Sequence, residues 1–405
     1  MLTWLEISKS SLVHNLKQFR KIIGRKIKLM AVVKSNAYGH GMIECAKIFE
    51  KNGADYLGVI NLDEALLLRK NGLKKPIFIL SYWTVPTNYP ATAGPHAFRR
   101  SPPTGVTRPG GGKSFTNIQM AIKKNIEFPV YTEQQINFLA KISQKIGKKA
   151  KVHLKIDTGT SRIGVLPENA VNIASKCLKS PWLEVRGVFT HFAKSEAKDQ
   201  TFTNKQAQKL LEIKEKLLKI PRFPKNALFH AGCTASTINN QATFFDMVRI
   251  GIGLYGLWPS QETKLGGRTS KVELKPAMAW KTKIIQVKEL PKGTFIGYDC
   301  TYKCRQKTKI AVLPVGYWDG YDRKLSNCGQ ALIRGRRVPI VGKVCMNLMM
   351  IDISKIKNIK TGDEVVLLGQ QKNQRITAEE IGEKIGTINY EVITRINSQL
   401  PRIYK

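Results

Sequence analysis

The sequence predicts an α/β protein with an N-terminal (β/α)8 TIM barrel and a C-terminal mainly β domain. Three observations predict it: a length of 405 residues, alternating apolar runs and amphipathic stretches up to about residue 256, and strand-like runs after about residue 270. A chain of this length normally divides into two domains. We expect the barrel over 10–256, the β domain over 270–405, and a first strand over 1–9 that packs with the β domain.

The barrel prediction depends on eight short apolar runs, most of them separated by helix-like stretches. The runs are 27–33, 56–60, 77–80, 128–132, 152–156, 185–192, 227–231 and 248–256. In 42–53, apolar residues recur every three or four positions, which is typical of an amphipathic helix that ends near Gly53. Eight β-then-α units indicate a TIM barrel. The alternative, an open doubly wound sheet, would need a glycine-rich turn after its first strand, where the sequence has none.

The β domain is predicted from runs joined by short polar or glycine-containing turns. These runs are 279–287, 309–315, 331–335, 338–344, 348–353 and 364–369. One helix is expected over 377–386, because it opens with a T-x-x-E capping box and closes at Gly386.

One segment, 83–115, fits neither domain. It is dense in Pro and Gly and contains no Leu, Ile, Asp or Glu. Such a composition cannot bury a core, so we expect a disordered surface insertion after the third strand. A linker-like insertion is the simplest interpretation. An artefact of sequence assembly or reading frame, and a functional lid, are the alternatives.

The net charge of +38 comes mostly from lysines spread along predicted helix faces such as 214–219. Without an RRM, zinc-finger or basic-zipper pattern, we interpret it as a solvated surface and do not expect nucleic-acid binding. Seven cysteines, an odd number, fit free thiols. Cys300 and Cys304 are spaced as half a zinc site, but no second pair accompanies them, so no metal is expected.

No apolar stretch reaches the roughly 18 residues of a membrane span. The N-terminal residues also lack a basic region followed by an apolar run, the pattern of a signal peptide. We therefore expect a cytoplasmic protein without a membrane partner.

Lys34 ends an apolar strand in the run AVVKSNAYGHG (31–41). A lysine at this barrel face either extends to solvent or, when partly desolvated, has a lowered pKa and can attack an aldehyde. The run resembles the cofactor-attachment motif of alanine racemases. That resemblance implies pyridoxal 5′-phosphate (PLP) as the cofactor and Lys34 as the lysine of its Schiff base.

The resemblance extends over nearly the whole chain, with 83–115 as the exception. LKIDTGTSRIGV (154–165) implies that Arg162 binds the phenolic oxygen of PLP and the substrate carboxylate, a role suited to a guanidinium fork. Lys155 matches a lysine that many family members carry carbamylated. Asp157 begins an Asp-Thr-Gly triplet, which alone also suggests an aspartic protease. That chemistry needs two such aspartates, and the sequence has no second copy.

Further segments supply the other cofactor contacts that the resemblance implies. GVFTHFA (187–193) places His191 beside the pyridine ring, and Leu80 is also expected to contact the cofactor. FHAGCTAS (229–236), MVRIGIGLYG (247–256) and INYEV (388–392) carry the phosphate site. Its members are Thr234, Gly251, Ile252, Tyr38 and Tyr390, which offer hydroxyls and backbone N–H groups.

Arg249 is the most diagnostic residue after Lys34. Most PLP enzymes present a carboxylate to the pyridine nitrogen, which keeps it protonated. An arginine stays charged and should keep that nitrogen unprotonated, so the ring becomes a weaker electron sink. Taken alone, Arg249 is equally well interpreted as a salt-bridge arginine of the barrel.

Racemisation needs a base on each face of the substrate Cα. Lys34 is one, and the resemblance makes Tyr298, in IGYDCTY (296–302), the other. Tyr317 matches an entryway residue, and the backbone N–H of Met346 matches a donor to the substrate carboxylate. In the family these residues come from the partner subunit, so the resemblance implies a head-to-tail homodimer with shared sites.

Two positions depart from the family pattern. Asn347 stands where the family usually has aspartate, which removes a negative charge expected near Lys34 and affects its pKa, the rate or the substrate preference. Cys233 and Thr234 stand where the family usually has Asn-Ser. Threonine keeps the hydroxyl, so phosphate binding should survive.

The resemblance implies interconversion of L-alanine and D-alanine, which supplies D-alanine for peptidoglycan. A broader-specificity amino-acid racemase is one alternative. A non-catalytic PLP-binding regulatory protein is another, although such a protein needs neither Tyr298 nor Met346. A pseudoenzyme is a third, if 83–115 disrupts the barrel.

Overall fold

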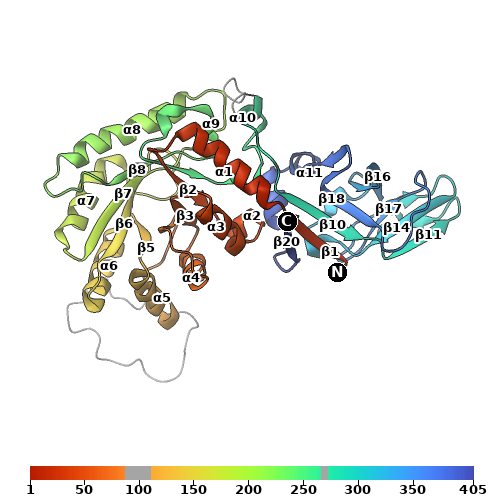
Figure 1. The fold of residues 1–405 in the computed structure, drawn as a ribbon, viewed down its shortest axis with the longest axis horizontal. Coiled ribbons are helices and arrows are strands. Elements are labelled where there is room, and N and C mark those ends of the chain that lie inside the picture. Colours follow the sequence, from red (N-terminus) through yellow and green to blue (C-terminus); the bar gives the residue numbers. More distant parts are fainter. Residues whose placement is uncertain (87–110, 266–271) are drawn as a thin grey trace.

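The computed structural model describes residues 1–86, 111–265 and 272–405. Eight parallel strands close into a barrel in chain order, and the last pairs with the first (Figure 1). They are β2 (Lys28–Val32), β3 (Tyr56–Val59), β4 (Ile77–Ile79), β5 (Ile126–Val130), β6 (Ala150–Lys155), β7 (Leu183–Phe189), β8 (Leu228–His230) and β9 (Met247–Ile250). All eight apolar runs overlap these strands, so the predicted TIM barrel is confirmed.

Helices surround the barrel (Figure 1). They are α1 (Lys9–Ile23), α3 (Met42–Lys51), α4 (Leu62–Lys70), α5 (Gly111–Lys123), α6 (Glu133–Ile146), α7 (Ala170–Lys179), α8 (Thr201–Leu218), α9 (Thr234–Asn239) and α10 (Gln261–Leu265). Helix α1 shows why they form. Ser8 caps it by accepting the N–H of Ser11, and Leu12, Leu16 and Phe19 recur on one buried face.

Side chains on the barrel strands alternate between two cores, as period 2 requires. In β2, Leu29 and Ala31 join the large core under the helices, whereas Met30 points into the barrel. The interior cluster also contains Tyr56, Phe78, Phe189 and Met247. Side chains therefore fill this part of the barrel interior.

The prediction of a disordered insertion over 83–115 is wrong at both ends of this segment. Trp83 is 5% exposed, and its indole N–H donates to the carbonyl of Pro129 at 2.8 Å. At the other end, α5 has begun by Gly111, and Phe115 packs against the core. Aromatic residues at the margins of a Pro- and Gly-rich stretch thus belong to the barrel. The rest of this prediction, over 87–110, lies outside the described residues.

The β domain is built on a sheet of order β11-β14-β17-β16-β15-β18-β10-β1-β20, with β19 paired to β18. Its strands are β1 (Thr3–Ile7), β10 (Met278–Lys283), β11 (Gln286–Leu290), β14 (Thr308–Leu313), β15 (Gln330–Ile333), β16 (Arg336–Val341), β17 (Met349–Asp352), β18 (Glu364–Gln371), β19 (Gln374–Ile376) and β20 (Arg402–Tyr404). A hairpin of β12 (Phe295–Ile296) and β13 (Tyr302–Lys303) accompanies it. The mainly β character predicted for this half is confirmed.

Two helices follow in this domain, α11 (Ala378–Ile385) and α12 (Asn389–Arg395). The predicted cap is present, because the hydroxyl of Thr377 accepts the N–H of Glu380 at 3.1 Å. Gly386 ends α11 at φ 77°, a left-handed conformation that glycine adopts at little cost.

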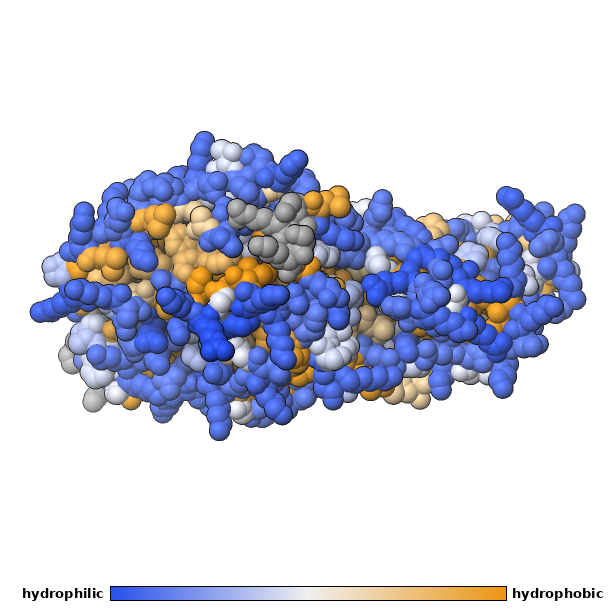
Figure 2. Space-filling model, turned by 45° about the horizontal axis from the view of Figure 1, so that its top comes forward, coloured by the Kyte–Doolittle hydropathy of each residue, from blue (hydrophilic) through white to orange (hydrophobic). Residues whose placement is uncertain are grey.

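Strand β1 joins the first residues of the chain to this sheet. It pairs antiparallel with β10 and parallel with β20, so both termini lie near the junction of the two domains (Figure 1). Hydrophilic residues cover most of the face in Figure 2, and the hydrophobic residues visible there gather mainly on the barrel half. Within the described part of the chain, no helix combines the length and the apolarity that crossing a bilayer requires.

Candidate functional site

A cavity of about 950 Å³ opens at the carboxyl ends of the barrel strands, where TIM barrels place their active sites. Eleven of the predicted site residues line it: Lys34, Tyr38, Leu80, Lys155, Arg162, His191, Thr234, Arg249, Gly251, Ile252 and Tyr390. Most of them lie at or just beyond a strand end. Lys34 follows β2, Leu80 follows β4, and Gly251 follows β9.

The turn that carries Lys34, α2 (Lys34–Tyr38), is left-handed. Ser35, Asn36, Ala37 and Tyr38 have φ between 52° and 54°. Non-glycine residues reach this region at a cost of roughly 1–2 kcal/mol each. Hydrogen bonds hold the turn, including that from the N–H of Ser35 to Glu64 Oε1 at 2.7 Å and that from the N–H of Met42 to Asn36 Oδ1 at 2.9 Å.

The ammonium group of Lys34 is destabilised at this place. Burial is the main cause of its lowered pKa, and the charge of Arg162 adds to it, while Glu64 acts in the opposite direction. A lowered pKa makes the neutral, nucleophilic amine more accessible. The same glutamate also accepts the N–H of Ile60 at 2.9 Å. Glu64 therefore stabilises the turn and also limits the lowering of the Lys34 pKa.

Asp157 organises the loop that presents Arg162. Its Oδ1 accepts the N–H groups of Gly159, Thr160 and Ser161, and its Oδ2 accepts the N–H of Arg162. Burial raises the pKa of Asp157, but these bonds outweigh it and the pKa is lowered. The Asp-Thr-Gly triplet is thus the cap of a loop, which gives no support to the aspartic-protease interpretation.

Lys155 is 7% exposed, and its Nζ lies 4.4 Å from the ring centroid of Phe189. Burial, together with the charges of Arg249 and Arg162, holds its pKa well below the usual range. A buried lysine between two guanidinium groups is therefore favoured as a neutral amine.

Arg249 is held on several sides at the floor of the cavity. Its Nη2 donates to the carbonyls of Thr190 and Ala231, both at 2.8 Å, and its Nη1 donates to His230 Nδ1 at 2.9 Å. Burial lowers the pKa of Arg249 to about 10, so the guanidinium stays charged at neutral pH. His191 lies beside it with Nδ1 at 3.4 Å, and burial and that positive charge hold the pKa of His191 well below its usual range.

The hydroxyl and glycine residues predicted to hold a phosphate lie together. Thr234 Oγ1 accepts the N–H of Gly251 at 3.0 Å, which leaves its own O–H as a donor. A Cβ on Gly251 would meet Tyr38 Oη at 2.3 Å, so a larger residue there would displace the Tyr38 hydroxyl. The rings of Tyr38 and Tyr390 lie with their centroids 6.2 Å apart. Burial, then the charge of Glu196, raises the pKa of Tyr390, so its phenol remains a donor.

Three predicted residues are not part of this cavity. Tyr298, Tyr317 and Met346 belong to the β domain and are 69%, 43% and 54% exposed. Asn347 lies beside them and is also exposed. Within one chain, the charged groups that influence Lys34 are Arg162 and Glu64, not position 347.

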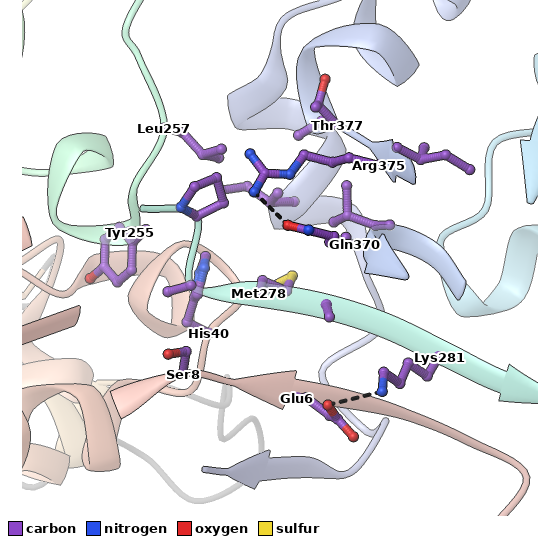
Figure 3. Close-up of a pocket in the computed structure, with 18 of the residues that line it drawn as sticks. Glu6, Ser8, His40, Tyr255, Leu257, Met278, Lys281, Gln370, Arg375 and Thr377 are labelled. Carbon is purple, nitrogen blue, oxygen red and sulfur yellow. Dashed lines mark hydrogen bonds and ion pairs between the residues drawn. The ribbon is translucent and has the colours of Figure 1, made fainter. Parts of the chain in front are cut away.

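A second cavity of about 270 Å³ lies at the junction of the two domains. Figure 3 shows His40 and Tyr255 on its barrel side and Arg375 and Gln370 on its β-domain side. His40 Nδ1 donates to the carbonyls of Ala37 and Tyr38, so this wall supports the Lys34 turn from behind. None of the predicted site residues lines this cavity.

Sequence reasoning missed the polar residues inside the barrel and the brace at Glu64. His230 and His153 form a hydrogen bond at 3.0 Å, and His153 contacts Glu127 at 2.8 Å. Each is a polar residue within a largely apolar run (ALFHA, VHLKI, IEFPV), which was the available signal. Over the described residues, no group of three His, Cys, Asp or Glu side chains is arranged to hold a metal ion.

The fold and the site define a class of barrel enzyme. A desolvated lysine, a buried arginine and a group of residues suited to bind a phosphate lie at the same end of the barrel, and a β domain follows. The family model for the N-terminal domain of alanine racemase matches residues 7–96 and 106–259, and that for its C-terminal domain matches 277–404. The chain therefore belongs to the alanine racemase family. Sequence analysis predicted that 83–115 would not resemble the family. Within the first domain, the family model leaves only 97–105 of that segment unmatched.

Individual relatives agree over full length. An alanine racemase of Methanococcus maripaludis is 38% identical over 406 residues, which cover 99% of this chain and 98% of the relative. The structure of the Clostridium difficile 630 alanine racemase superposes with a TM-score of 0.87 at 33% identity, covering 100% and 96% of the two chains. A histidine racemase of Leuconostoc mesenteroides subsp. sake has a TM-score of 0.84 at 27% identity, covering 100% and 98%.

Proposed function

We propose that this protein interconverts L-alanine and D-alanine and so supplies D-alanine for peptidoglycan. One observation carries the proposal. Eleven predicted residues of the lysine-and-arginine site line a single cavity at the carboxyl end of the barrel. The relatives that match along the full chain are alanine racemases, which is the activity we transfer to this chain.

The cofactor of this family is PLP, and the cavity fits it. Lys34 offers an amine of lowered pKa for the aldehyde, and Arg249 offers a fixed charge for the pyridine nitrogen. Thr234, the Gly251 backbone and the two tyrosines form a donor set suited to a phosphate. When bound, PLP supplies an electron sink that acidifies the substrate Cα–H bond.

The residues of this chain then move the proton. Lys34 Nζ stands at the barrel side of the substrate and exchanges the Cα proton on that face. Tyr298 Oη of a second copy exchanges it on the opposite face, which inverts the configuration. Arg162 and the backbone N–H of Met346 orient the substrate carboxylate, and Tyr317 narrows the entry.

The homodimer is part of this proposal. Tyr298, Tyr317 and Met346 are exposed on the β domain and do not line the cavity of their own chain. A head-to-tail second copy would bring this exposed set to the barrel rim. Asn347, also exposed, would reach Lys34 only from that second copy.

We further propose that Lys155 is carbamylated. Its neutral amine would add to the carbon of CO₂, forming an N–C bond and releasing a proton, and the resulting negative charge would face Arg162 and Arg249. With ¹³C-bicarbonate, NMR should show a carbamate signal that Lys155→Ala removes. Lys151→Ala, on the same strand, should keep it, and a wild type without the signal would refute this modification.

The experiment for the function is direct. Purified protein is incubated with PLP and L-alanine, and both enantiomers are followed by chiral chromatography. We expect D-alanine to accumulate to equilibrium, with Lys34→Ala as the inactive control. A folded, PLP-loaded wild type that produces no D-alanine would overturn the proposal.

A broader-specificity racemase is the second candidate, favoured by the similarity to a histidine racemase over the whole chain. Assays with serine, lysine, arginine and histidine beside alanine separate the two. Alanine should have the highest kcat/KM, and a different amino acid in that place would favour the second candidate. The expected cytoplasmic location stays a prediction.

A further inference from the structure

A chain of buried polar side chains crosses the interior of the barrel from Arg249 to Glu127. Arg249 Nη1 contacts His230 Nδ1 at 2.9 Å, His230 Nε2 contacts His153 Nδ1 at 3.0 Å, and His153 Nε2 contacts Glu127 Oε2 at 2.8 Å. The four side chains come from β9, β8, β6 and β5. Each is at most 5% exposed, so water does not compete for these bonds.

Aromatic rings pack against these four hydrogen-bonded side chains and give them apolar surroundings. Phe189 stacks on His230 with ring centroids 5.1 Å apart, and Phe78 lies 4.3 Å from His153. At Gly187, a Cβ would meet His153 Nδ1 at 2.5 Å, so the glycine makes room for the contact between the two imidazoles. In these apolar surroundings, a polar atom without a partner would be costly.

While Arg249 keeps its contact with His230, it sets the direction of every hydrogen bond in this series. A guanidinium can only donate, so His230 Nδ1 must accept and the ring proton of His230 lies on Nε2. His230 Nε2 therefore donates to His153 Nδ1, which places the proton of His153 on Nε2. That group then donates to Glu127, the carboxylate at the far end. Burial and the charge of Arg249 hold the pKa of His230 well below its usual range, in accord with a neutral ring.

We propose that Glu127 is a positioning residue for Arg249, acting through the tautomers of His153 and His230. As an ionised carboxylate it only accepts, so it requires the Nε2–H form of His153 and, in turn, of His230. Reversing His230 would set its Nδ1–H against an N–H of Arg249, and reversing His153 would force that reversal on His230. The guanidinium would then lose its anchor at Nη1, and its plane at the floor of the cavity would no longer be fixed.

The far end of the chain is anchored as well. Glu127 Oε1 lies 3.9 Å from Arg186 Nε, and Arg186 is partly exposed on β7. Arg186 is thus the ion-pair partner of the carboxylate that ends this series of hydrogen bonds.

The wild-type protein tests the direction without any mutation. Selective ¹⁵N labelling of histidine distinguishes the two tautomers by the shifts of Nδ1 and Nε2, and cofactor-free protein suffices. His153 and His230 should both be neutral with the proton on Nε2. Either ring protonated on Nδ1 would overturn the proposal.

Glu127→Gln tests the positioning, because an amide can donate as well as accept and no longer requires one tautomer. We expect mixed tautomers at His153 and a PLP dissociation constant raised by about tenfold to a hundredfold, since a charge-assisted hydrogen bond is lost. Glu184→Gln is the matched control, because Glu184 pairs with the same Arg186 but is not one of the four hydrogen-bonded side chains. Unchanged tautomers and affinity in Glu127→Gln would contradict the proposal.

The role of Arg249 toward a cofactor rests on the proposed function, and the two can fail separately. If the wild-type tautomers are as expected but no racemisation occurs, the hydrogen-bond chain stands and the function does not. If racemisation occurs but the tautomers are the opposite ones, the function stands and the proposal about Glu127 does not. Should Glu127→Gln fail to fold, the wild-type spectrum still decides the direction of the chain.

Discussion

At the barrel rim, Arg249 is 5% exposed and donates to two carbonyls and an imidazole, whereas in the β domain Tyr298 is 69% exposed. The first region is fastened by its own hydrogen bonds, as the four N–H groups on Asp157 also show. The second presents aromatic and apolar side chains to solvent. Under the proposed function, the barrel therefore holds the residues for the cofactor, whereas Tyr298 would act in the cavity of a second copy.

The largest effect is expected at the lysine of the barrel region. Under the proposed function, Lys34→Ala removes both the attachment of the cofactor and one of two bases, so racemase activity should fall by at least about a thousandfold. The absorbance of lysine-bound PLP should vanish as well. Lys28→Ala, at the exposed start of the same strand, should leave both unchanged. Activity retained in Lys34→Ala would remove the basis for assigning the chemistry to the barrel rim.

Tyr298→Phe probes the exposed region. It should lower activity about a hundredfold or more without changing stability, because the hydroxyl is lost from an exposed side chain. Tyr302→Phe, in the same hairpin, is the matched control.

Mixing the two inactive variants sharpens the comparison. If sites are shared between copies, a dimer of Lys34→Ala with Tyr298→Phe has one intact site, and random exchange should restore about a quarter of wild-type activity. Restoration is measured after dissociating and reassociating the mixture. A mixture that remains as inactive as its components would show that the two residues do not meet across a dimer.

The smallest effect concerns the loop bonds of the barrel rim. Asp157→Asn should lower the free energy of unfolding by about 1–3 kcal/mol, since a carboxylate that accepts four partly buried N–H groups is lost. The native pKa of Asp157 lies below 3.8, so its contribution is present above that value and is lost as the pH falls through the native pKa. Urea unfolding should show a deficit at pH 7 that shrinks below about pH 4. A deficit independent of pH would contradict this account.

The sequence by itself determined the barrel, the β domain and eleven of the residues that line the cavity. Apolar periodicity is a local property, and Lys34, Arg162 and Arg249 lie in contiguous motifs. It also contained the cap at Thr377, because a capping box spans only four residues. The burial at the margins of the Pro- and Gly-rich segment could not be predicted, because the burial of Trp83 depends on Pro129 and Phe128 of β5.

Only the tertiary structure decided how these residues are tuned. The left-handed turn at Ser35–Tyr38 exists because distant groups such as Glu64 hold it against its local preference. The tautomers inferred for His153 and His230 depend on partners brought together from four strands. Hydrogen-bond direction and burial are properties of such contacts, and no spacing along the chain encodes them.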